Sequence, residues 1–578
     1  MKATDYLANR ISWLGVRTVF GYQGGNIAHM IDSVWRHPAM EFISAYHEQG
    51  ASFSACGYAM ENHTIGVALA SSGPGAVNLI SGIANAYYDS IPVLFITGNV
   101  STHTMKESSA VRQKAFQEND IVSMVSSVTK YAVTVTDPHD LRFHFEKAVY
   151  LAESGRPGPV LLDLPHNIQK AELHFDNERS YTISPSETDD KLLFRDISYM
   201  TEVFKSAKRP LIVAGGGAGS DCSKKLINRL LEKWRIPVVV TLRGLDIVSH
   251  KEDCYIGFGG AYGNRAANCA VKYADAILVL GSRLDERFLC IGDKSLFSKK
   301  RIIHVDIDPV ELRHILPEEY GINMEVSRFI SALLTQDVPE LTFEKWTDTL
   351  RRWKKRYQPA DEAWTMNKAV SFLSSKAPED AVFCLDIGIN QMCAAQALML
   401  NGQQHCFTSA GHGAMGCSVP TGIGAAFAAG GKTVNCFVGD GALHMNIQEL
   451  LMLSRYSLPV HVLLMNNRCL GMIRDFQTKA FANRFAATVD ILQEIDYRKI
   501  ADAYHLEYCS VQNETGLQRA AEMMHSSKPC FIELLFAEHA DTNPKLGTDM
   551  FTQTPLLSDE EIAQMEEEAL LCGNIISW

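Results

Sequence analysis

Short runs of apolar residues alternate with longer stretches of helical periodicity along almost the whole chain. Examples are residues 65–69, 210–214 and 434–438, and each run leads into a glycine-rich or polar turn. Strands that are apolar on both faces and alternate with helices are typical of parallel sheets covered by helices. The pattern therefore predicts an α/β protein.

The apolar runs fall into three blocks, separated by a polar stretch near residues 175–190 and a charged stretch near 346–361. We predict three domains, each a doubly wound parallel sheet, and a C-terminal tail, at residues 1–175, 190–345, 362–540 and 541–578. In the tail, Ser558 and Glu561 have the spacing of a capping box that opens an acidic helix.

Composition narrows the class of protein. The chain has 578 residues, and its 54 basic side chains are outnumbered by 66 acidic ones, which argues against a dedicated nucleic-acid binder. No apolar run of about 18 residues occurs, and residues 1–10 lack the apolar core of a signal peptide. The 14 cysteines form no C-x-x-C pair, so reduced, buried thiols are expected. We therefore expect a cytoplasmic protein with no nucleic-acid partner and no membrane segment.

The third block carries the most specific signal. A Gly439-Asp440-Gly441 turn ends one apolar run, a helical pattern over 445–453 follows, and the next run ends in an Asn-Asn pair whose second residue is Asn467. A right-handed crossover brings both strand ends to one edge of the sheet. Carboxylate and amide oxygens suit Mg²⁺, and the glycines allow phosphates to approach the backbone. A Gly-Asp turn alone would indicate only a strand end, whereas the whole combination predicts a metal site.

This arrangement resembles the metal and diphosphate motif of thiamine diphosphate enzymes. Two segments of the first block, 47–51 and 70–78, resemble the pyrimidine-domain signatures of the acetolactate synthase branch of that family. The resemblance covers about residues 1–535 and continues through segments 116–118, 155–160, 305–309, 445–450 and 471–473. It implies a pyrimidine-binding domain, a central domain and a diphosphate-binding domain, in that order.

The resemblance also implies roles for individual residues. Glu48 would hydrogen-bond the cofactor's pyrimidine ring and favour its reactive tautomer, Met415 would support the bent cofactor, and the carbonyl of Gly413 would accept from its exocyclic amine. The backbone carbonyl of Cys469 would be the third protein ligand of Mg²⁺, beside Asp440 and Asn467. The remaining residues expected in catalysis or cofactor binding are Gln117, His412, Gly73, Asn78, Asn390, Gln391, Ala442 and Met472.

The second block contains a glycine-rich turn after a strand, which is a weak signal for a dinucleotide by itself. Acetolactate synthases carry an FAD without redox function on this domain, so the resemblance implies FAD here. The expected contacts are Gly215, Gly216, Gly217, Arg283 and Asp306. In the same stretch, Arg287 would point toward the substrate; the alternative is a vestigial fold in which Arg287 only pairs with a carboxylate.

The chain departs from the synthase pattern around the expected acceptor pocket. Phe476 stands where relatives have a Trp that recognises the second oxoacid, and His412 replaces a Leu. Gly25, Phe116 and Arg287 are the other expected substrate contacts. These departures predict that pyruvate is the donor, that acetolactate forms slowly, and that a larger ketone or aldehyde is the preferred acceptor. A titratable His412 could protonate the developing alkoxide; a packing histidine is the alternative.

Three function classes follow. The leading one is a carboligase that decarboxylates pyruvate and adds the two-carbon unit to a carbonyl acceptor, either an oxoacid or a keto sugar nucleotide. A simple 2-oxoacid decarboxylase is less favoured because the sequence has no His-His pair. A non-catalytic homologue is disfavoured because Glu48, Asp440 and Asn467 are all present. The resemblance further implies a homodimer or dimer of dimers, in which Glu48 serves the site of the opposite subunit.

Overall fold

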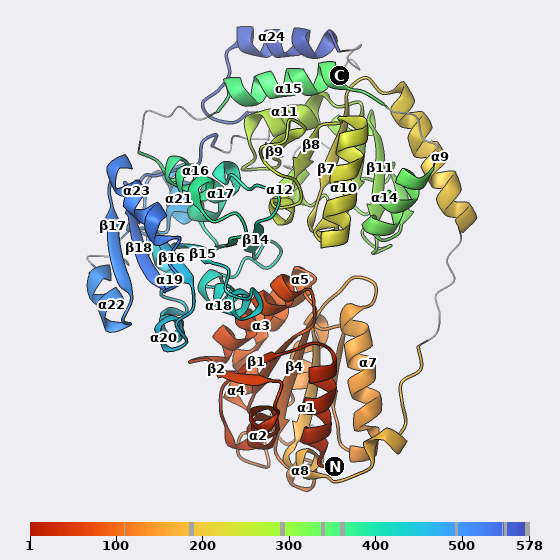
Figure 1. Ribbon diagram of the computed structural model, residues 1–578, viewed down its shortest axis with the longest axis vertical. Helices are drawn as coiled ribbons and strands as arrows, with labels where there is room; N and C mark the ends of the chain where they lie inside the picture. The colour runs from red at the N-terminus through yellow and green to blue at the C-terminus, as the bar shows by residue number, and fades with distance from the viewer. Residues whose placement is uncertain are drawn as a thin grey trace.

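The computed structural model describes residues 1–572, apart from 109, 184–189, 290–294, 337–340, 359–363, 490, 492–494, 546 and 548–551. Within the described residues, the strands form three parallel six-stranded sheets, each flanked by helices (Figure 1). The predicted α/β class with three parallel sheets is therefore confirmed. We call the parts that contain these sheets the first, second and third units.

In the first unit the strand order is β2-β1-β3-β4-β6-β5. The strands are β1 Thr18–Gly21, β2 Glu41–Ser44, β3 Gly66–Ala70, β4 Val93–Asn99, β5 Tyr131–Thr134 and β6 Val160–Pro165. The helices are α1 Ala3–Trp13, α2 Ala28–Arg36, α3 Glu48–Asn62, α4 Pro74–Asn78, α5 Ile80–Tyr88, α6 Ile121–Val125, α7 Leu141–Glu153 and α8 His166–Lys170. The central strands β3, β4 and β6 are buried throughout, as strands covered on both faces must be.

The second unit has the order β12-β11-β10-β7-β8-β9, so the direction of winding reverses between β7 and β10. Its strands are β7 Pro210–Ala214, β8 Val238–Val240, β9 Tyr255–Phe258, β10 Ala276–Leu280, β11 Arg301–Asp306 and β12 Tyr320–Asn323. Its helices are α9 Asp190–Ser206, α10 Asp221–Trp234, α11 Arg265–Tyr273, α12 Glu286–Leu289, α13 Ser295–Ser298, α14 Val326–Thr335 and α15 Glu344–Arg356. Sheets with this order bind dinucleotides beyond the carboxyl ends of the two strands where the winding reverses.

The third unit has the order β14-β13-β15-β16-β18-β17, which repeats the topology of the first unit. Its strands are β13 Val382–Leu385, β14 His405–Thr408, β15 Val434–Gly439, β16 Val460–Asn466, β17 Glu507–Val511 and β18 Cys530–Leu535. Its helices are α16 Met366–Lys376, α17 Ile389–Ala397, α18 Ser418–Ala428, α19 Asp440–Leu443, α20 Leu450–Arg455, α21 Gly471–Phe481, α22 Tyr497–Ala503 and α23 Glu514–Met523. The helical pattern predicted after Asp440 is therefore divided between α19, a short 3₁₀ turn and α20.

The first and third units share one hydrophobic core, and helices α3 and α18 pack directly against each other (Figure 1). Glycines permit this close approach. A Cβ atom at Gly57 of α3 would lie 1.9 Å from the carbonyl oxygen of Thr421, and one at Gly424 of α18 would lie 1.8 Å from that of Ser54. The two helix backbones therefore touch where they cross.

The C-terminal tail forms α24, Asp559–Leu570, which lies along α15 of the second unit (Figure 1). The capping box predicted at Ser558 and Glu561 is present, with both reciprocal hydrogen bonds. Glu568 accepts from the Trp353 ring and pairs with Arg356 at 2.8 Å, which fastens the helix to α15.

Candidate functional site

Asp440 lies at the carboxyl end of β15 and is 2% exposed. Its carboxylate accepts from the backbone N–H of Gly441 at 2.8 Å and from that of Arg468, just beyond the end of β16, at 2.5 Å. Burial raises the pKa of Asp440 to about 6, although these N–H groups act in the opposite direction. The two strand ends thus converge as the sequence predicts, and they bury a carboxylate that a cation would stabilise.

Asn467 and Cys469 lie in the same turn after β16. The amide nitrogen of Asn467 donates to the Cys469 sulfur at 3.3 Å, so its amide oxygen is the atom left to face an ion. The Cys469 thiol donates to the carbonyl of Glu538 at 3.2 Å, and burial raises the pKa of this thiol to about 11. A neutral, engaged thiol is a poor magnesium ligand, so only the carbonyl of Cys469 suits the expected role.

The expected diphosphate contacts lie beside this turn, at the reversal of winding between β13 and β15. A Cβ atom at Gly439 would lie 3.0 Å from the side-chain oxygen of Asn390, which shows how closely α17 approaches the end of β15. Gln391 donates to the Thr408 hydroxyl at 2.6 Å, and Ala442 is buried in α19. Ligands of open α/β sheets bind at this kind of reversal.

The segment 409–416 forms a tight loop that two residues hold in shape. The Ser409 hydroxyl accepts from the backbone N–H groups of Gly413 and Ala414, at 2.9 and 3.1 Å. The buried carboxylate of Asp386 accepts from the N–H of Gly416 at 2.8 Å. Gly413 has φ of +73° and open space on the side of a Cβ atom, so a ligand can approach its backbone. Met415 in this loop is half-buried against the core.

The first unit supplies a second cluster. Glu48 is the first residue of α3, and its carboxylate accepts from the side-chain amide of Asn78, at the end of α4, at 2.9 Å. The ring of His47 accepts from the N–H of Gln49 and caps the same helix. Glu48 is therefore fixed at the helix N-terminus with one oxygen engaged by an amide.

Gly73 and Gln117 lie together near this cluster. A Cβ atom at Gly73, which has φ of +61°, would meet the Gln117 side chain at 3.1 Å, and the amide oxygen of Asn119 accepts from the Gly73 N–H at 3.2 Å. Gly25 has open space where a Cβ atom would lie. Phe116 is 85% exposed, so its ring does not contribute to the core of a single chain.

Two carboxylates, which the sequence reasoning did not assign, connect the two clusters within one chain. Glu449 of the third unit accepts from the backbone N–H of Tyr46, two residues before Glu48, at 3.1 Å. Burial raises the pKa of Glu449 to about 7. The second contact runs in the opposite direction: the carboxylate of Asp89, in the first unit, accepts from the backbone N–H groups of Ala410 and Gly411 in the third unit, at 3.1 and 2.8 Å. Only the pairing of distant segments reveals these roles.

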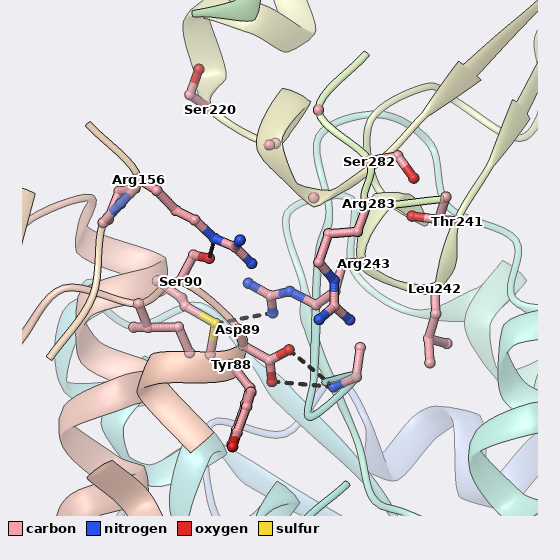
Figure 2. Close-up of a pocket in the computed structure, with 18 of the residues that line it drawn as sticks. Tyr88, Asp89, Ser90, Arg156, Ser220, Thr241, Leu242, Arg243, Ser282 and Arg283 are labelled. Atoms are coloured by element: carbon pink, nitrogen blue, oxygen red, sulfur yellow. Dashed lines mark hydrogen bonds between the residues drawn. The ribbon is translucent and has the colours of Figure 1, made fainter. Parts of the chain in front are cut away.

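A cavity of about 700 Å³ lies where the three units meet. Arg156 of the first unit and Arg243 and Arg283 of the second extend their guanidinium groups into it (Figure 2). The glycine-rich turn after β7, which contains Gly215, contacts the turn at Gly281 after β10. Three guanidinium groups beside two glycine turns, at the reversal of winding, suit the phosphates of a dinucleotide.

The other residues expected in the second unit also lie at this cavity. Gly216, Gly217 and Asp306 line it, and burial raises the pKa of Asp306. Arg287 lines it too; its guanidinium lies 3.7 Å from the Met392 sulfur and 6.0 Å from the centre of the Tyr262 ring.

Phe476, His412 and Met472, which the sequence places at the acceptor or the cofactor, all lie in the third unit. Phe476 is 57% exposed on α21 and makes an edge contact with Phe481. His412 is stacked on the ring of Tyr88 from the first unit, with ring centres 5.7 Å apart. Met472 is half-buried at the start of α21. Among the described residues, the hydrogen bonds of the Glu48 side chain stay within the first unit and those of the Asp440 side chain within the third.

The described cysteines are all free, and all except Cys222, Cys254 and Cys572 are buried, as expected from their scattered positions. In the part of the chain that the structure describes, no helix is long and apolar enough to cross a membrane.

Each of the three units matches a different domain of one protein family. Residues 1–124 match the family described as thiamine pyrophosphate enzyme, N-terminal TPP binding domain. Residues 197–333 match its central domain, and residues 386–534 match its C-terminal TPP binding domain. The three matches follow the order of the three sheets.

Curated relatives resemble the chain over nearly its whole length. An acetolactate synthase large subunit of Lactococcus lactis is 32% identical over 92% of this chain and 92% of its own. The acetolactate synthase isozyme 2 large subunit of Escherichia coli is 32% identical over 93% of this chain and 96% of its own. An acetolactate synthase of Arthrospira platensis is 33% identical over 92% and 94%.

Proposed function

This chain belongs to the thiamine pyrophosphate (thiamine diphosphate) enzyme family, in the branch of the acetolactate synthase large subunits. From that premise we propose that it decarboxylates a 2-oxoacid, pyruvate in the first instance, and joins the remaining two-carbon unit to the keto carbon of a second 2-oxoacid. The relatives support this carboligation over a simple decarboxylase and over a keto sugar nucleotide as acceptor.

One observation carries the proposal: the chain contains two residue clusters whose chemistry suits the two halves of a thiamine diphosphate site. The first half is the fixed carboxylate of Glu48 with Asn78 at 2.9 Å. The second is the convergence of Asp440 with the turn after β16, beside the glycine-rich backbone of residues 439–441. A non-catalytic homologue would have no need to keep both.

The second half fits the diphosphate and its metal. Asp440, the amide oxygen of Asn467 and the carbonyl of Cys469 are hard oxygen donors, the set that Mg²⁺ prefers when phosphate and water complete its shell. A buried carboxylate with a raised pKa gains most from such a cation. Gly439, with φ in the extended region, lets phosphate reach the start of α19.

When bound, thiamine diphosphate supplies the nucleophilic carbon and the electron sink for decarboxylation. Glu48 would share a proton with the pyrimidine ring nitrogen and so favour the reactive tautomer, and the amide of Asn78 holds the Glu48 carboxyl group in place for this. Ser409 fixes the loop that would present the Gly413 carbonyl to the cofactor, and Met415, which packs against the core, would support the cofactor. Gln117, whose side chain lies against Gly73, would complete the part of the cofactor pocket that the first unit contributes.

Because Glu48 and Asp440 hydrogen-bond only within their own units in the described residues, we propose that each complete site forms between two subunits. Glu48 of one chain would face the Asp440 turn of the other in a homodimer or a dimer of dimers. The exposure of Phe116 and Phe476 supports this arrangement, since both rings would be covered there. Together with Gly25, Arg287 and His412, they would then bound the acceptor.

The cavity among the three units would hold FAD without a redox role. Arg156, Arg243 and Arg283 would neutralise its phosphates, and Asp306 would face its ribose or adenine end. The test is the visible absorbance of the purified protein before and after denaturation. A protein reconstituted with excess FAD that releases no flavin would refute this part of the proposal.

Product analysis tests the main reaction. The full chain is incubated with thiamine diphosphate, Mg²⁺ and pyruvate, alone and with a panel of 2-oxoacids and larger carbonyl compounds, and products are identified by mass spectrometry. Acetolactate from pyruvate alone is expected; slow formation that a larger ketone or aldehyde outcompetes would instead support the acceptor predicted from Phe476 and His412. Acetaldehyde as the sole product would indicate a decarboxylase. Release of no carbon dioxide would contradict an enzymatic role.

A further inference from the structure

Two histidines and an aspartate, one from each unit, meet at the rim of the cavity. His63 follows the last residue of α3, Asp221 is the first residue of α10, and His405 is the first residue of β14. One potential ligand atom of each lies within 4.8 Å of the others. No short motif marks these residues, because they are 158 or more positions apart in the chain.

The spacing is close to that of a metal site. Nε2 of His63 lies 3.4 Å from a carboxylate oxygen of Asp221. In a tetrahedron with bonds of about 2.1 Å, neighbouring ligand atoms are about 3.4 Å apart. The rings of His63 and His405 lie edge to face, with centres 5.9 Å apart, so the two side chains are already neighbours. Small rotations of exposed side chains would close the remaining gap.

A buried carboxylate already orients His405. Nδ1 of His405 lies 2.7 Å from Glu61, and the Glu61 side chain is 2% exposed. Because Nδ1 is directed at the Glu61 carboxylate, Nε2 is the ring nitrogen of His405 left to bind an ion. A carboxylate behind a histidine is the usual outer support of a metal-bound imidazole.

We propose that His63, Asp221 and His405 bind a Zn²⁺ ion that joins the three units at the mouth of the cavity. Two imidazoles and one carboxylate suit zinc, whereas the all-oxygen turn at Asp440 suits magnesium. The three ligands leave a fourth position for water or for an anionic ligand in the cavity, since His63 and His405 both line it. This site is independent of the proposed reaction.

A zinc ion bound by these three side chains would link the three units to one another. His63 ends the helix that begins with Glu48, and Asp221 begins the helix after the glycine-rich turn of the second unit. An ion there would restrain the second unit against the other two and would narrow one entrance to the nucleotide cavity. Zinc should therefore raise the thermal midpoint of the full chain, because it binds only when the three units are in place.

The test uses the full chain, freed of metal by a chelator and then saturated with Mg²⁺ so that the Asp440 turn is occupied. Titration with Zn²⁺ alone, followed by calorimetry, should show one zinc per chain, and X-ray absorption should show nitrogen and oxygen neighbours. Binding should be lost in His63→Ala, whose side chain is partly exposed and whose removal leaves the core intact. Glu61→Gln should weaken binding at least about tenfold through the support of His405.

Two controls separate this site from adventitious binding. Cys222→Ser removes the exposed thiol next to Asp221, and His139→Ala removes an exposed histidine that is also paired with a carboxylate. Both variants should bind zinc as the parent chain does. Equal binding by the parent and by His63→Ala, loss of binding in Cys222→Ser, or sulfur neighbours in the absorption spectrum would each overturn the proposal.

Discussion

Gly57→Ala places a methyl group at the crossing of α3 and α18, where two effects of opposite sign compete. Alanine favours the interior of a helix over glycine by about 1 kcal/mol, so helix propensity alone predicts a more stable protein. However, the new Cβ atom would lie 1.9 Å from the carbonyl oxygen of Thr421, and its other near neighbours are also backbone atoms of Thr421. Backbone cannot rotate away as a side chain can.

The size of the required movement decides which effect wins. To restore the 3.4 Å of ordinary contact from 1.9 Å, the helices would have to separate by about 1.5 Å. Separation strains the hydrogen bond from Ser54 to the carbonyl of Pro420, at 3.0 Å, and opens the core that the two units share. Overpacking of this kind costs about 1–3 kcal/mol or more, which exceeds the gain in propensity. We therefore expect net destabilisation.

The effect is measured as a shift in the midpoints of thermal and urea unfolding. Midpoints are compared, and not free energies of unfolding, because a chain with several units does not have to unfold in a single two-state step. The reciprocal variant Gly424→Ala should behave alike, since its Cβ atom would lie 1.8 Å from Ser54. Gly25→Ala is the stability control, because nothing lies within 4 Å of its Cβ position. Since α3 begins with Glu48, the carboligation rate should also fall at least about tenfold. A raised midpoint with an undiminished rate would refute the packing argument.

Three further predictions concern the site. Glu48→Gln keeps the shape of the side chain but removes its charge, so the carboligation rate should fall at least about a hundredfold; near-normal turnover at saturating cofactor would contradict this. Asp440→Ala should abolish Mg²⁺-dependent binding of thiamine diphosphate in calorimetry, and unchanged affinity would count against the site. Burial raises the pKa of Glu449 from 4.5 to about 7, so the folded state holds its proton more tightly than the unfolded state. The stability that this proton confers is present below about pH 4.5 and is lost as the pH rises toward 7. The melting midpoint of the parent chain, relative to that of Glu449→Gln, should therefore decline over this interval. A constant difference between the two midpoints would show that Glu449 does not titrate there.

Much of the fold follows from local pattern. The buried central strands are continuous apolar runs, and the order of turns, helices and strands permits a parallel sheet. The convergence of Asp440 with the turn after β16 could also be predicted, because the handedness of a single crossover fixes which strand ends meet. The predicted domain boundaries and the roles of individual site residues stay predictions.

Other features have weak local signals. The edge strand β5 is only half-buried along its length, so its sequence lacks the apolar run by which central strands are recognised. The pattern over 445–453 has helical spacing, but the structure divides it because the 3₁₀ turn at Ile447–Glu449 brings Glu449 to the backbone of Tyr46. Here a contact with another unit overrides the local preference.

The sequence by itself determined the class of fold, the order of the three sheets and the residues at the ends of β15 and β16, since these depend on neighbours along the chain. Only the tertiary structure decided that Glu449 holds the segment before Glu48, that arginines from two units converge on one cavity, and that His63 meets Asp221 and His405. These groups come from separate segments of the chain, 403 positions apart in the case of Tyr46 and Glu449. Their proximity results from the packing of whole sheets and helices against one another, for which no short stretch of sequence carries a signal.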